Sequence, residues 1–397
     1  MFLISIEALQ RNSTILKETA QAAGCKIVLA QKGFSCWKAY PYIAPYLDGC
    51  CASGLWEGQL AKDYFGKHIV TYSPAYDEED IEALLEFTDH LDFNSLTQWF
   101  RFRERIMAHP RFLNGKLLCG LRINPEHSTG QTPIYDPCVA GSRLGITADQ
   151  LKGADLTGLS GLHFHTLCEQ DSPDLETTLQ AVDEKFGYLL RSEQFTYLNM
   201  GGGHWITKPF YQRDLLVRLV KEAREKYQVE VWLEPGEAVA IHSGVLRAKV
   251  MDVFESAGHK LVILDISATA HMPDVIEMPY RPDVYLVEKS PAESSTQLPC
   301  VTLADENYQL ASDEVSIHTY RLGGPTCLAG DVIGYYSFSR PLVAGDVLVF
   351  DDMAHYTMVK TTTFNGVKHP SIALLHPCGK IEIIRDFAYQ EFRDRLS

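Results

Sequence analysis

Short apolar segments alternate with stretches of helix length over the first 240 residues, and this alternation constrains the fold more than any other feature. The apolar segments are rich in Val, Ile, Leu and aromatic residues, as buried β-strands are. Strands that alternate with helices run parallel, and eight such units favour a (β/α)8 barrel. The eight segments are Lys26–Lys32, Asp48–Ser53, His68–Ala75, His90–Ser95, Leu117–Pro125, Gly158–Leu167, Phe195–Gly203 and Glu230–Glu237.

Two of the spacers have the periodicity of amphipathic helices. Asp80–Phe87 and Asp214–Tyr227 place apolar residues three or four positions apart, so each is expected to bury one face. An open, doubly wound sheet uses the same alternation and is the alternative architecture. In a barrel, the carboxyl ends of all the strands surround one mouth, and active sites lie there. Polar residues in this sequence gather at those predicted strand ends.

The pattern changes near residue 240, where strands follow one another without helical spacers and Gly- and Pro-containing turns separate them. We therefore expect a barrel over residues 10–240 and a mostly β domain over residues 241–397, joined by a strand within residues 1–9. The expected strands of the second domain are Val245–Val253, His259–Ile266, Val347–Phe350, Tyr356–Lys360 and Ser371–Leu375.

The chain is acidic, with 36 Lys and Arg against 51 Asp and Glu, a net charge of −15. This balance argues against nucleic acid or an anionic membrane as partner, and it suits a cationic small-molecule substrate. No apolar run approaches the roughly 18–20 residues that span a bilayer, and no signal peptide is evident. The ten cysteines include no CxxC pair, and Cys50 and Cys51 are neighbours, so we expect a reduced, cytoplasmic protein.

Lys32 and Gly201–Gly203 are the first candidates for a functional site. Lys32 follows the first barrel strand, where desolvation in the mouth can lower the pKa of an amine and free it for Schiff-base chemistry. The glycines follow the seventh strand, and phosphate sites of barrels cluster near strands seven and eight. Consecutive glycines let backbone N–H groups approach such an anion. A solvated surface lysine and a flexible turn are the ordinary alternatives.

Glu234, His163 and His165 end two further barrel strands. A carboxylate in the mouth can pair with a protonated pyridine nitrogen, although Glu234 could also cap a turn. The two histidines lie two positions apart on one strand and so face the same side. They could share a zinc ion, but no third or fourth ligand is evident at neighbouring strand ends. We expect no metal and favour stacking of one imidazole on a flat ring.

Cys327 is the candidate of the second domain. It lies in the sequence GGPTCLAGD (323–331), where Gly and Pro fix a sharp loop that can present a thiol. A thiol in such a loop can donate a proton or act as a nucleophile. A buried structural cysteine is the alternative.

Taken together, these motifs resemble the fold-type III, pyridoxal-phosphate-dependent decarboxylases of basic amino acids, which include ornithine, arginine and diaminopimelate decarboxylases. The resemblance covers nearly the whole chain and keeps one order: a lysine after the first strand, GLHFH (161–165), GGG (201–203), EPG (234–236), GPTC (324–327) and a tyrosine near the C-terminus. It implies a barrel followed by a β domain, and pyridoxal phosphate as the cofactor.

The resemblance also implies roles for individual residues. Lys32 would hold the cofactor as a Schiff base, His165 would stack on the cofactor's ring, and Glu234 would pair with the ring nitrogen. The residues expected to bind the cofactor's phosphate are Gly202, Gly203 and Tyr356.

The same resemblance implies a homodimer whose active sites are shared across the interface. Cys327 and Asp331 would reach the site from the partner subunit, Cys327 as proton donor and Asp331 toward the substrate. Phe364 and Asn365, in FNG, match a short motif of the family near that site.

Three segments narrow the resemblance to the carboxynorspermidine/carboxyspermidine decarboxylases. They are YSPAY (72–76), HMPDVIEMPYRP (271–282) and EPGE (234–237). Many relatives in the wider family read EPGR, with the arginine on the phosphate. Here Glu237 takes that position, so the phosphate contacts of those relatives do not transfer directly.

The function implied is decarboxylation of carboxynorspermidine to norspermidine, or of carboxyspermidine to spermidine, in polyamine biosynthesis. Such a substrate carries cationic amines well beyond its reacting carbon, and buried ammonium groups need partners. Glu237 and Asp274 are the expected partners and Glu277 is a further candidate, unless these are surface carboxylates. A diaminopimelate, ornithine or arginine decarboxylase, a metal-dependent barrel hydrolase and a cofactor-binding module are the alternatives.

Overall fold

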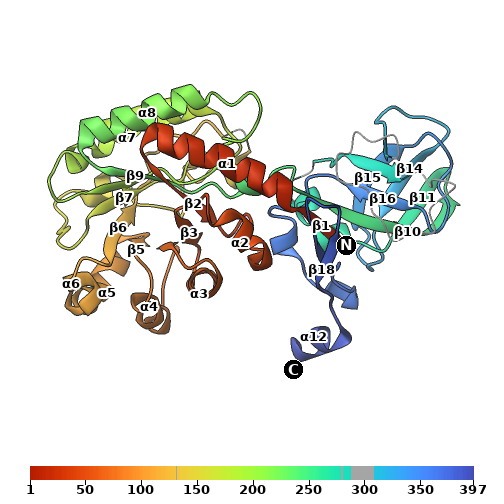
Figure 1. The fold of residues 1–397 in the computed structure, drawn as a ribbon, viewed down its shortest axis with the longest axis horizontal. Helices are drawn as coiled ribbons and strands as arrows, with labels where there is room; N and C mark the ends of the chain where they lie inside the picture. The colour runs from red at the N-terminus through yellow and green to blue at the C-terminus, as the bar shows by residue number, and fades with distance from the viewer. Residues whose placement is uncertain (131, 279, 288–307) are drawn as a thin grey trace. The chain divides into compact units, whose positions relative to one another are not determined.

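The computed structural model describes residues 1–130, 132–278, 280–287 and 308–397. Its chain forms two compact units. One unit is Gln10–Val239, and the other combines Met1–Leu9 with Ala240–Ser397. Figure 1 shows that the first unit mixes strands and helices, whereas the second consists mainly of strands.

The first unit is a closed barrel of parallel strands, which confirms the predicted barrel and excludes the open sheet. The barrel closes because the last strand pairs with the first, with Lys26 opposite Trp232. Nearly every strand residue is buried, as in sheets covered on both faces. The strands are β2 (Lys26–Ala30), β3 (Gly49–Ala52), β4 (His68–Tyr72), β5 (His90–Phe93), β6 (Leu118–Arg122), β7 (Gly161–His163), β8 (Tyr197–Asn199) and β9 (Glu230–Leu233).

Helices connect most of these strands, and polar side chains fix where several begin. The Asp77 carboxylate accepts a hydrogen bond from the Asp80 backbone N–H at 2.8 Å, at the start of a predicted helix. Ser95 caps the next long helix in the same way. The helices are α1 (Ile6–Ala23), α2 (Tyr40–Ile43), α3 (Leu55–Tyr64), α4 (Glu78–Leu85), α5 (Leu96–Ala108), α6 (Pro110–Leu113), α7 (Ser172–Leu190), α8 (Arg213–Tyr227) and α9 (Glu237–Ala240).

Aromatic and polar side chains fill the interior of the barrel in layers. The His90 ring stacks on Tyr197 at 4.3 Å between ring centroids and meets Trp232 edge-on at 4.9 Å. Asp92, two residues along β5, points to the same side and accepts a hydrogen bond from the Tyr197 hydroxyl at 2.6 Å. The layer that contains Asp92 is therefore polar, although it is buried.

The second unit is built on a ten-stranded sheet, in agreement with the predicted β domain. The N-terminal strand lies inside this sheet, parallel to one neighbour and antiparallel to the other. The strands are β1 (Phe2–Ser5), β10 (Gly244–Ser256), β11 (His259–Leu264), β12 (Val284–Val287), β13 (Tyr308–Leu310), β14 (Thr319–Gly323), β15 (Val332–Ser337), β16 (Val347–Phe350), β17 (Ile372–Leu375) and β18 (Ile381–Arg385). Short helices α10 (Ala268–His271), α11 (Asp274–Glu277) and α12 (Tyr389–Asp394) complete it.

One predicted strand of this unit is wrong. The segment Tyr356–Lys360 forms a turn of 3-10 helix over Met358–Lys360 instead. Tyr356 has a φ of 48°, in the left-handed region, and its carbonyl accepts a hydrogen bond from the Lys360 N–H at 3.1 Å. A left-handed φ interrupts the regular geometry of a strand.

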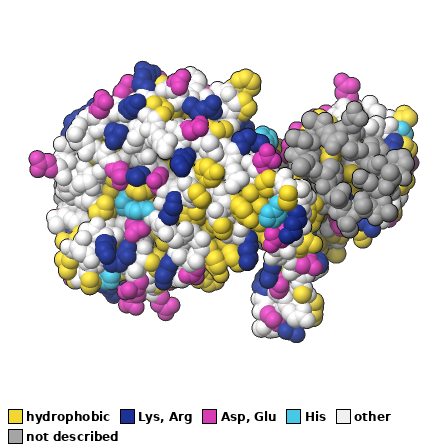
Figure 2. All heavy atoms as spheres, viewed as in Figure 1, with side chains coloured by type: hydrophobic (Ala, Val, Ile, Leu, Met, Phe, Trp, Pro, Cys, Tyr) yellow, Lys and Arg dark blue, Asp and Glu magenta, His cyan; other side chains and the backbone are white. Residues whose placement is uncertain are grey.

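The surface shows no separation of charge on the face seen in Figure 2, where acidic and basic side chains are interspersed over the barrel unit. Within the parts of the chain that the structure describes, we find no helix long and apolar enough to cross a bilayer. The nine cysteines in those parts are free thiols.

We expect acid to destabilise the barrel through His90. Burial lowers the pKa of this histidine to about 3, whereas an unfolded chain protonates its histidines near pH 6.5. Below that pH the unfolded state gains a proton that the folded state excludes, so the free energy of unfolding falls by about 2 kcal/mol per such residue down to about pH 5. The His90→Phe variant keeps the ring stacking and removes the titration.

Urea unfolding of both proteins at about pH 7 and about pH 5 tests this. The wild type should lose more stability than His90→Phe between the two conditions. Equal losses would show that His90 does not couple folding to pH.

Candidate active site

Lys32 lies just beyond β2 at the mouth of the barrel. Solvent reaches its side chain, and its ammonium nitrogen lies 3.4 Å from His165 Nε2. The surrounding protein nevertheless desolvates the amine, and this lowers its pKa, with a smaller contribution in the same direction from the nearby Arg122 guanidinium. At a given pH, the Lys32 amine is therefore neutral in a larger fraction of molecules than the amine of an ordinary lysine. The neutral amine is the nucleophilic form.

The tautomer of His165 follows from its hydrogen bonds. The Gly202 backbone N–H donates to His165 Nδ1 at 2.8 Å, so in the neutral ring the proton sits on Nε2. Burial, with the Lys32 charge nearby, lowers the pKa of His165 well below its usual value and keeps the ring neutral. The contact between Nε2 and Lys32 is thus a hydrogen bond when the amine is neutral and accepts it.

Glu234 occupies the floor of the mouth, just beyond β9, and is 4% exposed. Its Oε1 accepts a hydrogen bond from Asn199 Nδ2 at 2.6 Å. Its Oε2 lies 3.5 Å from His163 Nε2, and His163 Nδ1 lies 3.3 Å from Asp92 Oδ2. These distances bring Glu234, His163 and Asp92 together inside the barrel, and the predicted pairing of Glu234 with a cofactor stays a prediction. Cys51 also lies beside Glu234, and burial raises the pKa of its thiol.

The glycine loop packs so closely that side chains cannot replace its hydrogens. Gly201 and Gly203 have φ of 68° and 82°. A Cβ on Gly202 would lie 2.3 Å from the Glu234 carbonyl oxygen. The Gly202 N–H is already bonded to His165, whereas within the described residues the Gly203 N–H has no hydrogen-bond partner. The loop can therefore offer the Gly203 N–H to an anion without rearrangement.

Glu237 is the first residue of α9 and is half-buried beside this loop. Its Oε1 accepts a hydrogen bond from the indole nitrogen of Trp205 at 2.8 Å, and Lys208 lies over the same indole ring. The carboxylate that replaces the arginine of many relatives is thus held by a residue that follows the glycine loop.

In the β unit, a side-chain network fixes the loop that carries Cys327. The Cys327 side chain is exposed, and its backbone N–H donates to Asn365 Oδ1 at 2.8 Å. Asp331 is 4% exposed, and its carboxylate accepts hydrogen bonds from the hydroxyls of Ser267 and Thr326. Within its own chain Asp331 therefore orders the loop, and its predicted contact with substrate stays a prediction.

The other predicted residues of the β unit lie in two places. Asp274 and Glu277, at the two ends of α11, share the Lys360 ammonium, which lies 2.5 Å and 3.2 Å from their carboxylate oxygens. The two carboxylates with this one lysine keep a net negative charge. Tyr356 is half-buried in the left-handed turn, and its role toward a phosphate stays a prediction.

Sequence reasoning missed the polar residues inside the barrel that surround the predicted ones. Asp92, Asn199 and Arg122 are all buried, and Arg122 donates a hydrogen bond to the His165 carbonyl oxygen at 3.2 Å. The sequence does contain a sign of them, because these polar residues interrupt short apolar strands. A charged residue in such a strand must face either a polar interior or solvent.

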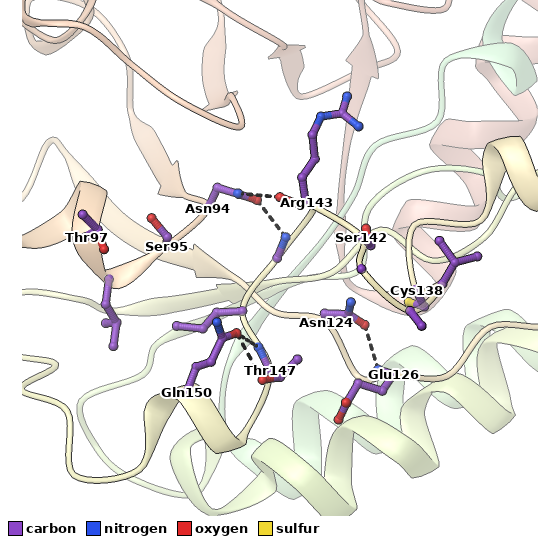
Figure 3. A pocket seen from close by; sticks show the side chains of 16 residues that line it. Asn94, Ser95, Thr97, Asn124, Glu126, Cys138, Ser142, Arg143, Thr147 and Gln150 are labelled. Carbon is purple, nitrogen blue, oxygen red and sulfur yellow. Dashed lines mark hydrogen bonds between the residues drawn. The ribbon is translucent and has the colours of Figure 1, made fainter.

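A polar cavity of about 810 Å³ lies beside the mouth, at the carboxyl ends of β5 and β6. Asn94 lines this cavity, and its Oδ1 accepts a hydrogen bond from the Tyr72 hydroxyl at 2.6 Å. The Tyr72 ring in turn meets His163 edge-on, so these contacts connect the cavity with the floor of the barrel mouth. Figure 3 shows Asn124 and Glu126 among its lining, while Arg143 extends away from them.

Comparison with known proteins identifies close relatives. Residues 69–354 match a family model described as pyridoxal-dependent decarboxylase, C-terminal sheet domain. A carboxyaminopropylagmatine decarboxylase from Synechocystis is 41% identical over 100% of this chain and 94% of its own length. A carboxynorspermidine/carboxyspermidine decarboxylase from Campylobacter jejuni is 39% identical over 98% of this chain and 96% of its own.

Solved structures agree with this relationship. Carboxynorspermidine decarboxylase from Campylobacter jejuni, complexed with norspermidine, has 38% identity and a TM-score of 0.84, covering 100% of this chain and 99% of its own. Diaminopimelate decarboxylase from Helicobacter pylori shares the fold at 18% identity, with a TM-score of 0.80 over 100% and 96% of the two chains.

We expect Gly202→Ala to destabilise the barrel by about 1–3 kcal/mol, because the new methyl group meets a backbone oxygen that cannot move by itself. Gly54→Ala is the matched control, since Gly54 has an extended φ of 169° and no atom within 4 Å of the added Cβ. The two variants are compared by denaturant unfolding. A loss for Gly202→Ala no larger than that for Gly54→Ala would contradict the close packing of the loop.

Proposed function

The chain belongs to the pyridoxal-dependent decarboxylases, and we propose that it removes CO2 from a carboxylated polyamine, with carboxynorspermidine or carboxyspermidine as the substrate. One observation carries the proposal: the barrel mouth brings together Lys32, His165, Gly203 and Glu234, each at the end of a different strand. Full-length relatives that act on such substrates support it.

The residues of the mouth suit pyridoxal phosphate. Lys32 offers an amine whose pKa is lowered by desolvation, as a covalent link to an aldehyde requires. His165 offers a neutral, flat ring, and Glu234 a buried carboxylate for a protonated ring nitrogen. The Gly203 N–H can meet a phosphate oxygen, and we propose that Gly202 and Tyr356 complete that site.

Pyridoxal phosphate, when bound, withdraws the negative charge left on the substrate carbon as CO2 leaves. Lys32 would anchor the cofactor and, because desolvation lowers the pKa of its amine, could take part in releasing the product. Glu234 would pair with the cofactor's ring nitrogen, and His165 would stack on the ring. We propose that the exposed Cys327 thiol delivers the proton that the substrate carbon needs after CO2 is lost.

We propose that carboxylates recognise the distal amines of the substrate. Asp274 and Glu277 share one lysine, so a substrate ammonium that joins them meets a cluster with a net negative charge. Glu237 presents a second carboxylate, oriented by Trp205. Charge-assisted hydrogen bonds of this kind are the stronger ones in proteins.

Carboxyaminopropylagmatine is the second candidate substrate, because the relative named for it is 41% identical over the whole chain. Its tail ends in a guanidinium instead of an ammonium group. CO2 release from a panel of carboxynorspermidine, carboxyspermidine, carboxyaminopropylagmatine and meso-diaminopimelate distinguishes the candidates. Turnover of diaminopimelate alone would overturn the proposal.

The functional unit is proposed to be a homodimer, with Cys327 of one subunit completing the site of the other. Asp331 holds the Cys327 loop in shape through Ser267 and Thr326. The free thiols suit the reducing cytoplasm, which we propose as the location.

Mixed dimers test the shared site. Lys32→Ala and Cys327→Ala are each expected to be inactive as pure proteins. After subunit exchange, half of the dimers are mixed and carry one intact site, so activity should recover to roughly a quarter of the wild-type level. CO2 release is the measurement.

Lys32→Ala alone should also fail to form the cofactor link that borohydride reduces, and this identifies the anchoring lysine. Verified exchange without recovery of activity would place both residues in the site of one chain.

Neutralising a carboxylate should weaken use of the cationic substrate. We expect Glu237→Gln and Asp274→Asn each to lower kcat/KM by about 5- to 150-fold, the equivalent of about 1–3 kcal/mol. Glu237→Gln keeps an acceptor for Trp205, and Asp274→Asn leaves Lys360 paired with Glu277. The affinity for pyridoxal phosphate should not change. An unchanged kcat/KM, or a loss of cofactor binding instead, would contradict a role of these carboxylates in substrate recognition.

A further inference from the structure

A buried row of three ionisable side chains crosses the floor of the barrel mouth. Asp92 Oδ2 lies 3.3 Å from His163 Nδ1, and Glu234 Oε2 lies 3.5 Å from His163 Nε2. The three side chains come from β5, from β7 and from the end of β9, and each is at most about 5% exposed. These contacts are close approaches: among the described residues, neither ring nitrogen of His163 makes a hydrogen bond of standard geometry.

The outer oxygens of the row are already occupied by donors that carry no charge. Tyr197 donates its hydroxyl to Asp92 Oδ1 at 2.6 Å, and Asn199 donates its amide to Glu234 Oε1 at 2.6 Å. The second oxygen of each carboxylate faces His163, and the Cys51 thiol is a further hydrogen-bond partner of Glu234. Other ionisable groups lie around the row. They are Lys32, Cys51, Tyr72, Tyr76, His90, Cys119, Arg122, His165 and Tyr197.

The hydrogen-bonding capacity of the three side chains limits how many protons the row can hold. An ionised carboxylate only accepts hydrogen bonds, and a neutral imidazole has a single N–H. With a carboxylate oxygen at each ring nitrogen, a neutral ring would set a lone pair against one of those oxygens. One further proton, either on His163 or on a carboxylate, removes that repulsion.

We propose that His163 carries this proton and thereby acts as the positioning residue for Glu234. As an imidazolium fixed by Asp92, it keeps Glu234 ionised and holds its carboxylate in the orientation that pairs with the ring nitrogen of the cofactor. This inference rests on the proposed function, because the need for an ionised Glu234 comes from the cofactor. It adds Asp92 and His163 to the residues on which that pairing depends.

The test compares His163→Gln, Asp92→Asn and the double variant, each reconstituted with pyridoxal phosphate. His90→Gln is the matched control: His90 is a buried histidine on the same strand as Asp92, and its ring packs on Tyr197 and Trp232. The measurements are the cofactor's absorbance as a function of pH, the dissociation constant of the cofactor, and kcat and KM.

We expect His163→Gln to lower kcat by about 10- to 100-fold, the usual cost of removing a group that orients a functional residue. The ring nitrogen should lose its proton at lower pH, with the absorbance midpoint shifted by roughly one unit, since a tenfold change in affinity for the proton has that size. Asp92→Asn should act in the same direction. The double variant should be no worse than His163→Gln, because Asp92 acts through His163.

Three results would overturn the inference: an unshifted midpoint in His163→Gln, additive losses in the double variant, or the same shift in His90→Gln. If His163→Gln does not fold, as judged by circular dichroism, Asp92→Asn provides the same comparison. Wild-type protein without a lysine-linked absorbance band would instead overturn the proposed function. The two failures are therefore distinguishable.

Discussion

Closure of the barrel is the constraint on which the site depends. Because β9 pairs with β2, the segments that follow these two strands lie side by side, and the Ala30 N–H donates to the Pro235 carbonyl oxygen at 3.1 Å. This contact brings Glu234 and Lys32, which are distant in the sequence, to one mouth. The glycine loop after β8 joins them, since the Glu234 N–H donates to the Gly201 carbonyl oxygen at 2.7 Å. An open sheet would separate these groups.

Burial then sets the chemistry of the mouth. Removal from water disfavours every charged form, so it lowers the pKa of Lys32 and of His165 and raises that of Cys51. A neutral amine and a neutral imidazole are the forms that an aldehyde cofactor with a flat ring needs. The row through His163 differs from these groups, because we propose that an imidazolium lies there between two carboxylates.

The β unit contributes a different kind of order. Its candidate residues lie on loops and on the short helix α11, and side-chain hydrogen bonds hold these segments in place. Asn365 binds the backbone at Cys327, and Lys360 ties the 3-10 helix Met358–Lys360 to α11. Segments held in this way can vary in sequence and length without changing the sheet beneath them.

The sequence by itself determined the barrel strands, because fully buried parallel strands read as uninterrupted apolar runs, and it placed Lys32, His165, Glu234 and the glycines at the strand ends. Only the tertiary structure decided which interior side chains meet. Strand alternation fixes the side to which Asp92 points, but the partner across the barrel depends on how the strands are staggered on closure. The turn at Tyr356 could not be predicted from the sequence either. A tyrosine adopts a left-handed φ only where the surrounding tertiary structure enforces it.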